Sequence, residues 1–426
     1  MAPLSRRGLL GATGALAAPW AARAQGGARL LVVGGGFGGA SAASYARRAH
    51  PWLDVTLVEP HARFITCPYG NLVLAGERRV EDITHSYDGL RARGVRVLHD
   101  RAAGIDPVAR RVRLAGGETL AYDRLILSPG IAIRYGALEG YDEAAAEAMP
   151  HAWIAGDGTQ LRLLRRQLEE MPDGGTVGLS IPANPFRCPP GPYERISLIA
   201  LYLSRHKPRS KILALDAKDA FSKQGLFQDA WNALYPGMIE WVPASGDGRV
   251  VRVDARERVL ETEFGTRHRV DVANVIPPQS AAAIATGTGL ADATGWVPVD
   301  ALSFEARAAA GIHVVGDANI PGPMPKSGFV ASSTAKQAVA SAAALLRGEA
   351  PPEAVHFNTC YSHAGAEYGI SIVNLFRPNA ARTSFTEVPD AGGTSPRGNL
   401  PEQRRLEALY ADAWYAGITQ DMFGGA

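Results

Sequence analysis

A glycine-rich turn near the N-terminus constrains most strongly what this chain can fold into. Gly34, Gly36 and Gly39 form a G-x-G-x-x-G pattern between an apolar run, residues 29–33, and an Ala/Ser-rich stretch that we expect to be helical to about His50. The first glycine permits a tight turn, the second lets a pyrophosphate approach the backbone, and the third lets helix and strand pack closely. The helix N-terminus offers N–H donors and a positive dipole end to phosphates. The turn therefore predicts a dinucleotide site.

An acidic residue closes the next predicted strand, residues 54–59. Glu59 stands where a carboxylate accepts the 2′-hydroxyl of a ribose. Strand, helix and strand make a βαβ unit, and such units build parallel sheets. Further buried-type strands are predicted at 122–128, 176–182, 211–216 and 313–316. The predicted fold class is α/β, with two Rossmann-like dinucleotide-binding domains.

A second motif, late in the chain, identifies the dinucleotide. Residues 311–318 form a predicted strand that ends in Gly-Asp-Ala. The segment resembles the second FAD motif of flavoproteins with two dinucleotide-binding domains, in which the aspartate, here Asp317, contacts the ribityl chain. A helix that begins at Gly328 and Phe329 would point its N-terminus at the flavin pyrimidine ring, where its dipole stabilises negative charge. Lys326 either adds to that positive charge or is a solvated surface lysine.

The middle of the chain repeats the strand and turn but not the glycines. After the strand at 176–182, the turn at 183–195 carries four prolines. Proline has no N–H to offer a phosphate and holds the backbone rigid. We therefore expect this domain to keep the dinucleotide fold without binding a nicotinamide nucleotide, so that another donor reduces the flavin.

Three cysteines, Cys67, Cys188 and Cys360, are widely separated in the sequence, which excludes a compact zinc motif, and no metal site is predicted. In an oxidising compartment two of them can pair, which leaves the third free or otherwise bonded. Cys188 lies in the proline-rich turn, which faces the flavin in this architecture, and the last domain can bring Cys360 to the same face. A redox-active disulfide, a structural disulfide and two unrelated thiols all remain open from these positions.

The N-terminal segment has the features of a removable leader. Arg6 and Arg7 precede a short apolar run, residues 9–18, and a small-x-small site follows at 22–24. The segment resembles the twin-arginine export signal, so we expect a periplasmic protein that is exported folded, with its cofactor already bound. No other stretch approaches 18 uninterrupted apolar residues, and we expect no integral membrane span.

The charge balance excludes one class of partner. Without Arg6, Arg7 and Arg23 of the leader, the 44 basic residues fall to 41, against 42 acidic residues. No basic stripe points to nucleic acid.

Together these features resemble the flavoprotein subunit of flavocytochrome c sulfide dehydrogenase and, more distantly, the sulfide:quinone reductases. The resemblance covers nearly the whole chain after the leader. Residues 64–68 resemble the family segment whose cysteine is linked by a thioether to the flavin 8α carbon, which implies that FAD is covalently bound through Cys67. The segments around Cys188 and Cys360 resemble those of the catalytic disulfide, and Glu194 matches the acidic residue proposed to handle protons.

The resemblance implies a reaction. Sulfide attacks the disulfide, and the electrons pass through FAD to a c-type cytochrome. The chain contains no C-x-x-C-H, so such a haem belongs to another subunit. The alternatives are a sulfide:quinone reductase, an accessory flavoprotein of a periplasmic sulfur-oxidising complex and an NAD(P)H-dependent disulfide reductase.

One amphipathic stretch near the C-terminus bears on the quinone alternative. Residues 406–415 carry no lysine cluster, so a helix packed on its own domain is favoured over a membrane surface. Trp414 or Tyr415 of this stretch can approach the flavin.

The predicted domain organisation follows from these assignments. It comprises an export signal at 1–24, a first part of the FAD-binding domain at 29–150, a degenerate NAD-like domain with the disulfide loop at 151–285, a second part of the FAD-binding domain at 286–350, and a C-terminal α+β capping domain at 351–426.

Overall fold

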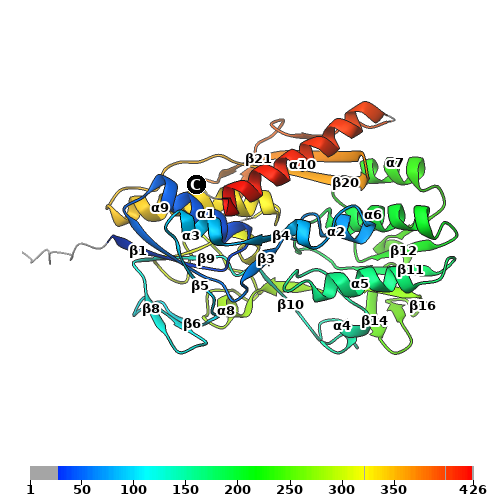
Figure 1. Cartoon of the computed structure of the whole chain (residues 1–426), viewed down its shortest axis with the longest axis horizontal. Coiled ribbons are helices and arrows are strands. Elements are labelled where there is room, and N and C mark those ends of the chain that lie inside the picture. The colour runs from blue at the N-terminus through cyan, green and yellow to red at the C-terminus, as the bar shows by residue number, and fades with distance from the viewer. Residues whose placement is uncertain (1–26, 321, 399, 425–426) are drawn as a thin grey trace, which may run out of the picture.

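The fold is described from a computed structural model, shown in Figure 1. The structure describes residues 27–320, 322–398 and 400–424, so the predicted leader at 1–24 lies outside the described residues. Two parallel sheets lie side by side, and a C-terminal hairpin and helix extend across both (Figure 1). This arrangement confirms the predicted α/β class.

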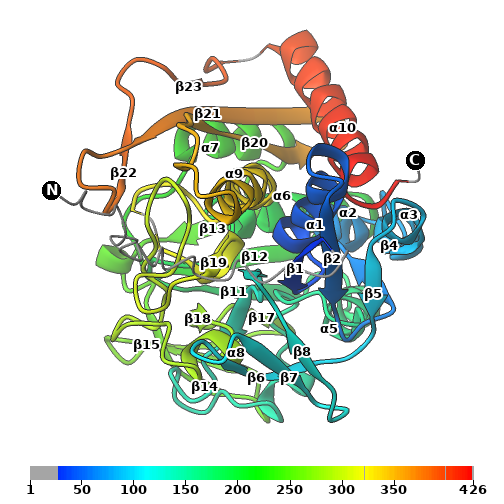
Figure 2. The ribbon, with the colours of Figure 1, turned by 90° about the vertical axis from the view of Figure 1, so that its left-hand side faces the viewer.

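The first sheet has five parallel strands in the order β19-β9-β1-β2-β5. Their bounds are β1 Ala28–Val33, β2 Leu53–Val58, β5 Arg96–Leu98, β9 Arg124–Leu127 and β19 Ile312–Val314. Helices α1 (Phe37–Ala49) and α9 (Gly328–Leu346) pack together on one side of it, and the meander of β6, β7 and β8 lies on the other (Figure 2). The meander strands are β6 Ala102–Asp106, β7 Arg111–Leu114 and β8 Thr119–Ala121. Because both faces are covered, the strands are nearly continuous apolar runs.

Strand β19, the late strand predicted at 313–316, lies in the first sheet as predicted, since Ile312 pairs with Leu125. The strand predicted at 122–128 is shorter in the structure, where it is β9 (Arg124–Leu127). A local hydrogen bond explains why it begins later than predicted. The Asp123 carboxylate accepts a hydrogen bond from the backbone N–H of Arg29 at 2.7 Å, which fixes the chain just before β9.

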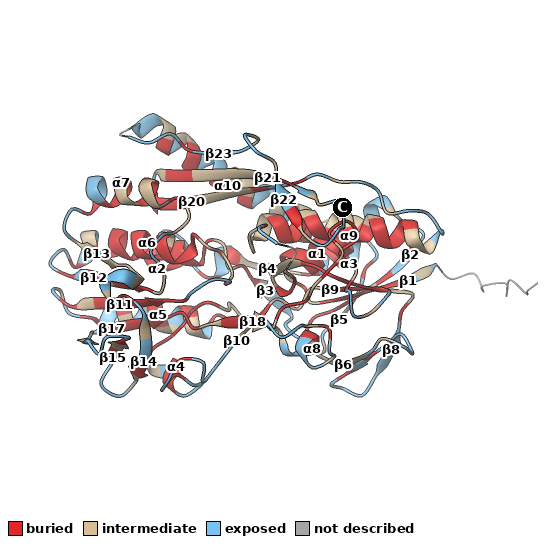
Figure 3. Cartoon of the chain, turned by 180° about the vertical axis from the view of Figure 1, so that it is seen from behind, coloured by how far each residue is buried: buried red, intermediate tan, exposed pale blue. Residues whose placement is uncertain are grey.

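The second sheet has four parallel strands in the order β13-β12-β11-β17. Its strands are β11 Thr176–Ile181, β12 Lys211–Asp216, β13 Ile239–Val242 and β17 Val272–Val275, and its helices include α5 Thr159–Glu170, α6 Gly191–His206 and α7 Gln224–Leu234. The strands and the inner helix faces are buried (Figure 3). An antiparallel pair, β10 (Ile131–Ile133) and β18 (Gln279–Ala281), joins the two halves.

The C-terminal segment consists of strands β20 to β23 and helix α10. Their bounds are β20 His356–Gly365, β21 Tyr368–Pro378, β22 Phe385–Glu387, β23 Gly393–Thr394 and α10 Pro401–Phe423. Strand β20 packs on α6 and α9, whereas α10 packs on β21 and α1, so this segment contacts both halves (Figures 1 and 3). Helix α10 is longer than the amphipathic stretch predicted at 406–415, and it packs on its own domain as favoured.

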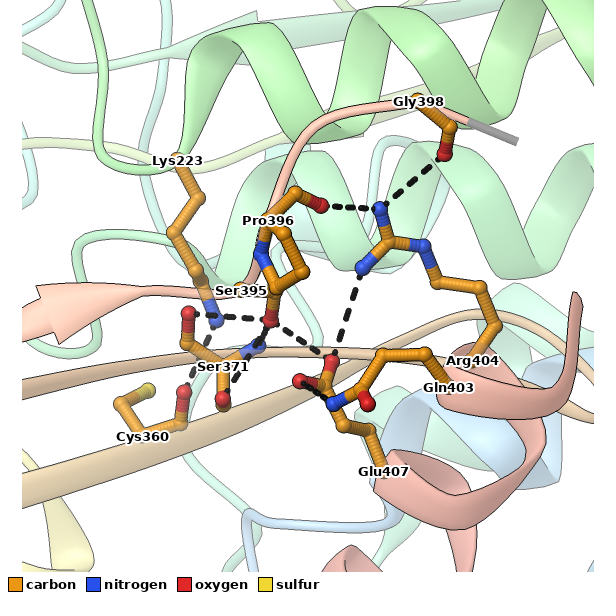
Figure 4. Close-up of polar contacts among 9 residues, drawn as sticks. All are labelled: Lys223, Cys360, Ser371, Ser395, Pro396, Gly398, Gln403, Arg404 and Glu407. Atoms are coloured by element: carbon orange, nitrogen blue, oxygen red, sulfur yellow. Dashed lines mark hydrogen bonds and ion pairs between the residues drawn. The ribbon is translucent and has the colours of Figure 1, made fainter. Parts of the chain in front are cut away.

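A buried polar network fastens α10 to the hairpin (Figure 4). The Ser395 hydroxyl donates to Glu407 Oε2 at 2.6 Å and accepts from the backbone N–H of Ser371 at 2.7 Å. Arg404 donates to the carbonyl oxygen of Pro396 at 2.6 Å. These contacts fix β21, and through it the paired strand β20. In the part of the chain that the structure describes, no helix is both long and apolar enough to cross a membrane.

Candidate functional site

A cavity of about 800 Å³ lies where the carboxyl ends of the first sheet meet the middle domain and β20. Every residue predicted for the site lines it except Gly39. Those residues are Gly34, Gly36, Glu59, Cys67, Cys188, Glu194, Asp317, Lys326, Gly328, Phe329 and Cys360. The fold therefore brings to one place side chains that are far apart in the sequence.

The glycine turn forms one end of the cavity. Gly34 has φ +95°, and a Cβ there would lie 2.2 Å from the carbonyl oxygen of Ser128. A Cβ on Gly39 would lie 1.7 Å from the carbonyl oxygen of Gly34, so Gly39 serves the close packing of helix on strand and does not face the cavity. Gly36 precedes the first residue of α1 and provides no side-chain cap, which leaves the first N–H groups of the helix for a ligand.

Glu59 stands directly after β2, nearly buried, beside the same turn. Its carboxylate accepts hydrogen bonds from the backbone N–H of Gly35 at 2.8 Å and of His61 at 3.0 Å. These bonds hold the acid at the cavity wall, where the sequence predicts a ribose contact.

Asp317 also lines the cavity, and Oδ1 of its carboxyl is buried without a hydrogen-bond partner among the described residues. Burial raises the pKa of this carboxyl, and the charges of Arg187 and Lys326 oppose that shift. A buried polar atom without a partner costs free energy, so this position suits a hydroxyl-bearing ligand such as a ribityl chain. The residues present therefore fit FAD, with phosphates at the glycine turn and the ribityl chain at Asp317.

The N-terminus of α9 opens onto this region. The Ser327 hydroxyl caps the helix by accepting from the backbone N–H of Val330 at 3.1 Å. Gly328 and Phe329 then line the cavity at the positive end of the helix dipole.

Lys326 is not the solvated surface lysine that remained open from the sequence. Its ammonium lies 3.8 Å from the ring centroid of Trp296 and donates to the carbonyl oxygen of Asp317 at 2.9 Å. Burial lowers its pKa to about 8. Lys326 thus holds the Asp317 loop and places a positive charge at the cavity wall.

Cys67 faces the cavity from the loop between β3 (Arg63–Ile65) and α2 (Gly70–Ala75). The Thr66 hydroxyl fixes this loop, since it bonds to the carbonyl oxygen of Pro68 and to the Tyr415 hydroxyl, both at 2.8 Å. Trp414 also lines the cavity, whereas Tyr415 stacks on Tyr69 with ring centroids 4.1 Å apart.

Cys188 and Cys360 line the large cavity together, and both also line a smaller one of about 180 Å³. Cys188 has φ +57°, a left-handed conformation that is uncommon outside glycine, and its N–H donates to the carbonyl oxygen of Lys326 at 2.8 Å. All three cysteines are free thiols in this structure. Burial raises the pKa of Cys188 well above its usual value, and the nearby Cys360 adds to that shift.

Glu194, in the first turn of α6, lies between α2 and β20. Its carboxylate accepts from the Asn71 side chain at 2.9 Å and from the backbone N–H of His363 at 2.8 Å. Its charge raises the pKa of both Cys188 and Cys360. The acid is therefore held within electrostatic reach of both thiols.

Comparison with known protein families assigns the segments of the chain. "Pyridine nucleotide-disulphide oxidoreductase" matches residues 28–157, "Sulfide dehydrogenase (flavocytochrome c) flavoprotein chain, central" matches 161–277, and "Flavocytochrome c sulphide dehydrogenase, flavin-binding" matches 352–423. The sulfide dehydrogenase (flavocytochrome c) flavoprotein chain of Chlorobaculum thiosulfatiphilum is 60% identical over 45 residues, which are 94% of that sequence and 11% of this chain. The chain belongs to this sulfide dehydrogenase flavoprotein family.

Sulfide:quinone oxidoreductases are also relatives of this flavoprotein. The mitochondrial enzyme of Mus musculus is 25% identical over 299 residues, which cover 68% of this chain and 66% of that protein. The solved structure of the sulfide:quinone oxidoreductase from Aquifex aeolicus superimposes with a TM-score of 0.71 at 17% identity and covers 92% of each chain, which shows a shared fold. The chain is an FAD-binding oxidoreductase of the type that acts on sulfide.

Sequence reasoning missed a buried cation of this sulfide dehydrogenase flavoprotein. The Arg195 guanidinium lines the cavity and donates to neutral oxygens, among them the carbonyl of Ala152 at 2.7 Å and the side chains of Asn71 and Asn274 at 3.0 Å. Burial lowers its pKa to about 9, which leaves it protonated at neutral pH. The signal in the sequence was an arginine directly after Glu194, near the start of a helix whose residues are mostly buried.

Proposed function

We propose that this chain oxidises sulfide through Cys188 and Cys360 and delivers the electrons, through its FAD, to a c-type cytochrome on another subunit. The observation that carries the proposal is that both thiols line the cavity formed by the glycine turn and the α9 N-terminus. A cysteine pair at this wall can exchange electrons with a flavin that the turn and helix hold.

The first step is a thiol–disulfide exchange. In the oxidised protein the two sulfurs form a disulfide, and HS⁻ attacks one of them. The bond between the cysteines breaks, a new S–S bond forms to the sulfide sulfur as a persulfide, and the other cysteine leaves as a thiolate. FAD, held by the glycine turn and the α9 N-terminus, would supply a two-electron acceptor for this pair of sulfurs. As the electron pair leaves, the thiolate would bond to the outer sulfur of the persulfide, which would lose its proton.

Glu194 is proposed to take up and release the protons of this exchange. Its carboxylate is fixed by Asn71 and by the backbone of His363, and its negative charge raises the pKa of both thiols. A held carboxylate beside a reacting sulfur is suited to general acid–base work. Arg187 and Arg195 line the same wall and attract the anionic substrate.

Cys67 is proposed to form the thioether to the flavin 8α carbon. The support is its place on the cavity wall, in a loop fixed by Thr66. The link would keep the cofactor bound when its charge changes during turnover.

A periplasmic location is part of the proposal. It is supported by the twin-arginine pattern within residues 1–24, and the cytochrome partner is supported by the flavocytochrome relative. Export in the folded state requires FAD to bind in the cytoplasm first.

A quinone acceptor is the second candidate, since sulfide:quinone oxidoreductases are relatives over most of the chain. Helix α10 also exposes Leu409 and Tyr410 by about half, an apolar pair that a membrane surface can cover. The two acceptors are separated by supplying cytochrome c or a soluble quinone to the sulfide-reduced protein.

The test has two parts. Acid precipitation of the purified protein should leave the yellow colour in the pellet, and sulfide in a stopped-flow cell should bleach the flavin within seconds. A colourless pellet removes the role of Cys67. If sulfide leaves the flavin oxidised, the sulfide reaction is wrong and an accessory role in a sulfur-oxidising complex takes its place.

A further inference from the structure

A nearly buried lysine lies behind the strand that carries Cys360. Lys223 immediately precedes α7, and its side chain extends onto β20 (Figure 4). The ammonium donates to the carbonyl oxygen of Cys360 at 3.0 Å and to the Ser362 hydroxyl at 2.8 Å. Lys223 therefore touches the redox strand at the reacting residue, from a segment that is distant in the sequence.

Among the residues that the structure describes, Lys223 has no ion-pair partner, and both of its hydrogen-bond acceptors are neutral. An unpaired ammonium in a buried position costs free energy. Lys218, five residues earlier, shows the compensated arrangement, since its ammonium lies 2.6 Å from Asp216 Oδ1. The buried ammonium of Lys223, which has no such carboxylate partner among the described residues, needs a different explanation.

The backbone conformation of Lys223 also costs free energy. Its φ is +61°, in the left-handed region that non-glycine residues rarely adopt. Such conformations persist where the surrounding structure holds them, and they often occur at functional sites. Here the conformation precedes the first turn of α7, and the side chain that leaves this point reaches β20.

Two charged groups act on Cys360, the negative Glu194 on α6 and the positive Lys223 directly before α7. Arg187 lies beside Cys188 in the proline-rich turn, and His363 lies further along β20. Burial raises the pKa of Cys360 and Glu194 raises it further, whereas Lys223 lowers it. Arg187 and Lys223 both lower the pKa of Cys188, whereas Lys223 is the cation that lowers the pKa of Cys360.

We propose that Lys223 is a positioning residue of the sulfide reaction, which fixes the main chain of β20 at Cys360 and provides the positive charge that stabilises the Cys360 thiolate when the disulfide opens. The inference rests on the proposed function, because it assigns that thiolate to the opened disulfide. The thiol with the better stabilised thiolate is the better leaving group, so the arrangement favours HS⁻ attack on Cys188 and departure of Cys360. A fixed charge performs this task without reorganisation during the step.

The test measures thiol ionisation directly, independent of turnover. The reduced holoprotein is alkylated with iodoacetamide at a series of pH values, and mass spectrometry follows the Cys360 and Cys188 peptides separately. We expect Lys223→Met to raise the midpoint of Cys360 alkylation by about one pH unit, because it removes a nearby opposite charge. The Cys188 midpoint should move less, and Lys223→Arg should restore most of the shift.

Lys218→Met is the matched control, since it removes a largely buried lysine that already has a carboxylate partner. The pH midpoint of Cys360 alkylation in this variant should equal that of the wild type. Should Lys223→Met fail to fold, Lys223→Gln keeps a donor near the Cys360 carbonyl oxygen without the charge and allows the same comparison.

Two results overturn the proposal. A lower melting temperature with an unchanged Cys360 midpoint shows that Lys223 only supports the fold. A larger shift at Cys188 than at Cys360 shows that the charge serves the other thiol. Failure of the sulfide reaction is seen separately, as wild-type flavin that sulfide does not bleach, whatever the alkylation midpoints are.

Discussion

The two Rossmann-like halves of this flavoprotein begin in the same way and differ in the turn after the first strand. In the first half, β1 leads through the glycine turn into α1, whose first backbone N–H groups have no side-chain cap and can bind a phosphate. In the second half, β11 leads through a proline-rich turn into α6, and the turn presents Cys188 to the cavity. In the proposed function, the first turn holds the cofactor through its backbone and the second presents a reactive thiol.

The difference shows how one supersecondary unit serves two purposes. A phosphate needs close approach and donors, which glycine permits. A thiol that reacts at a fixed point needs a rigid loop, which proline provides. The shared strand and helix place both turns at the same cavity, and in the proposed function the second half contributes a reactive thiol there in place of a nucleotide.

The largest effect is expected from the second turn. Cys188→Ser should lower the rate of flavin reduction by sulfide about a thousand-fold or more, since loss of a nucleophilic residue removes the reaction path. FAD should stay bound, because the glycine turn is intact. Stopped-flow absorbance measures the rate, and the flavin-to-protein absorbance ratio measures occupancy. A rate close to that of the wild type would contradict the division of tasks between the turns.

Two glycine substitutions compare the turns directly. Gly39→Ala should cost more than about 3 kcal/mol in the free energy of unfolding and release FAD, because the new Cβ meets the carbonyl oxygen of Gly34 at 1.7 Å. Gly191→Ala meets only side-chain atoms, Trp153 at 2.8 Å and Cys188 Sγ at 3.0 Å, which can move. It should cost about 1–2 kcal/mol and keep FAD. Urea unfolding and flavin content measure both, and equal losses would show that the two turns are equally constrained.

Acid should destabilise both halves through buried neutral histidines. Burial lowers the pKa of His313, on β19, and of His151, beside Arg195, to about 4 from the usual 6.5. The unfolded chain therefore binds more protons below pH 6.5, so stability is complete above that pH and falls as the pH drops toward 4, by about 3 kcal/mol for each histidine.

Thermal unfolding across this pH range measures the effect. His313→Asn and His151→Asn should each flatten the decline. If only one of them does so, the two halves unfold separately and not as one unit.

The smallest effect is expected outside both halves. Gly417 is an exposed glycine inside α10, and a Cβ there meets no atom within 4 Å. Gly417→Ala should raise the free energy of unfolding by about 0.5–1 kcal/mol, since alanine is the better helix former. Urea unfolding measures the gain, with sulfide-dependent bleaching as the control. A loss of stability would show that glycine is needed at this position too, and would weaken the contrast drawn at Gly39.

Much of the fold and part of the site follow from local patterns. The strand at Lys211–Asp216 has its predicted bounds, and the helix after the glycine turn ends one residue from its predicted end. The glycine turn and the prolines around Cys188 reveal their tasks through steric rules that act on the backbone of a few neighbouring residues. The catalytic roles of Cys188, Cys360 and Glu194, by contrast, were predicted from the resemblance of their segments to the sulfide dehydrogenase family.

Only the tertiary structure decided which charges face those groups. Lys223 and Arg195 carry no local motif, and each reaches the site because a helix from the middle domain packs against β20 or the cavity wall. The same holds for Lys326, which the sequence left either solvated or functional and which the fold places over Trp296. Backbone conformation is set by short-range sterics, whereas the electrostatic environment of a thiol depends on side chains that meet only when distant segments pack.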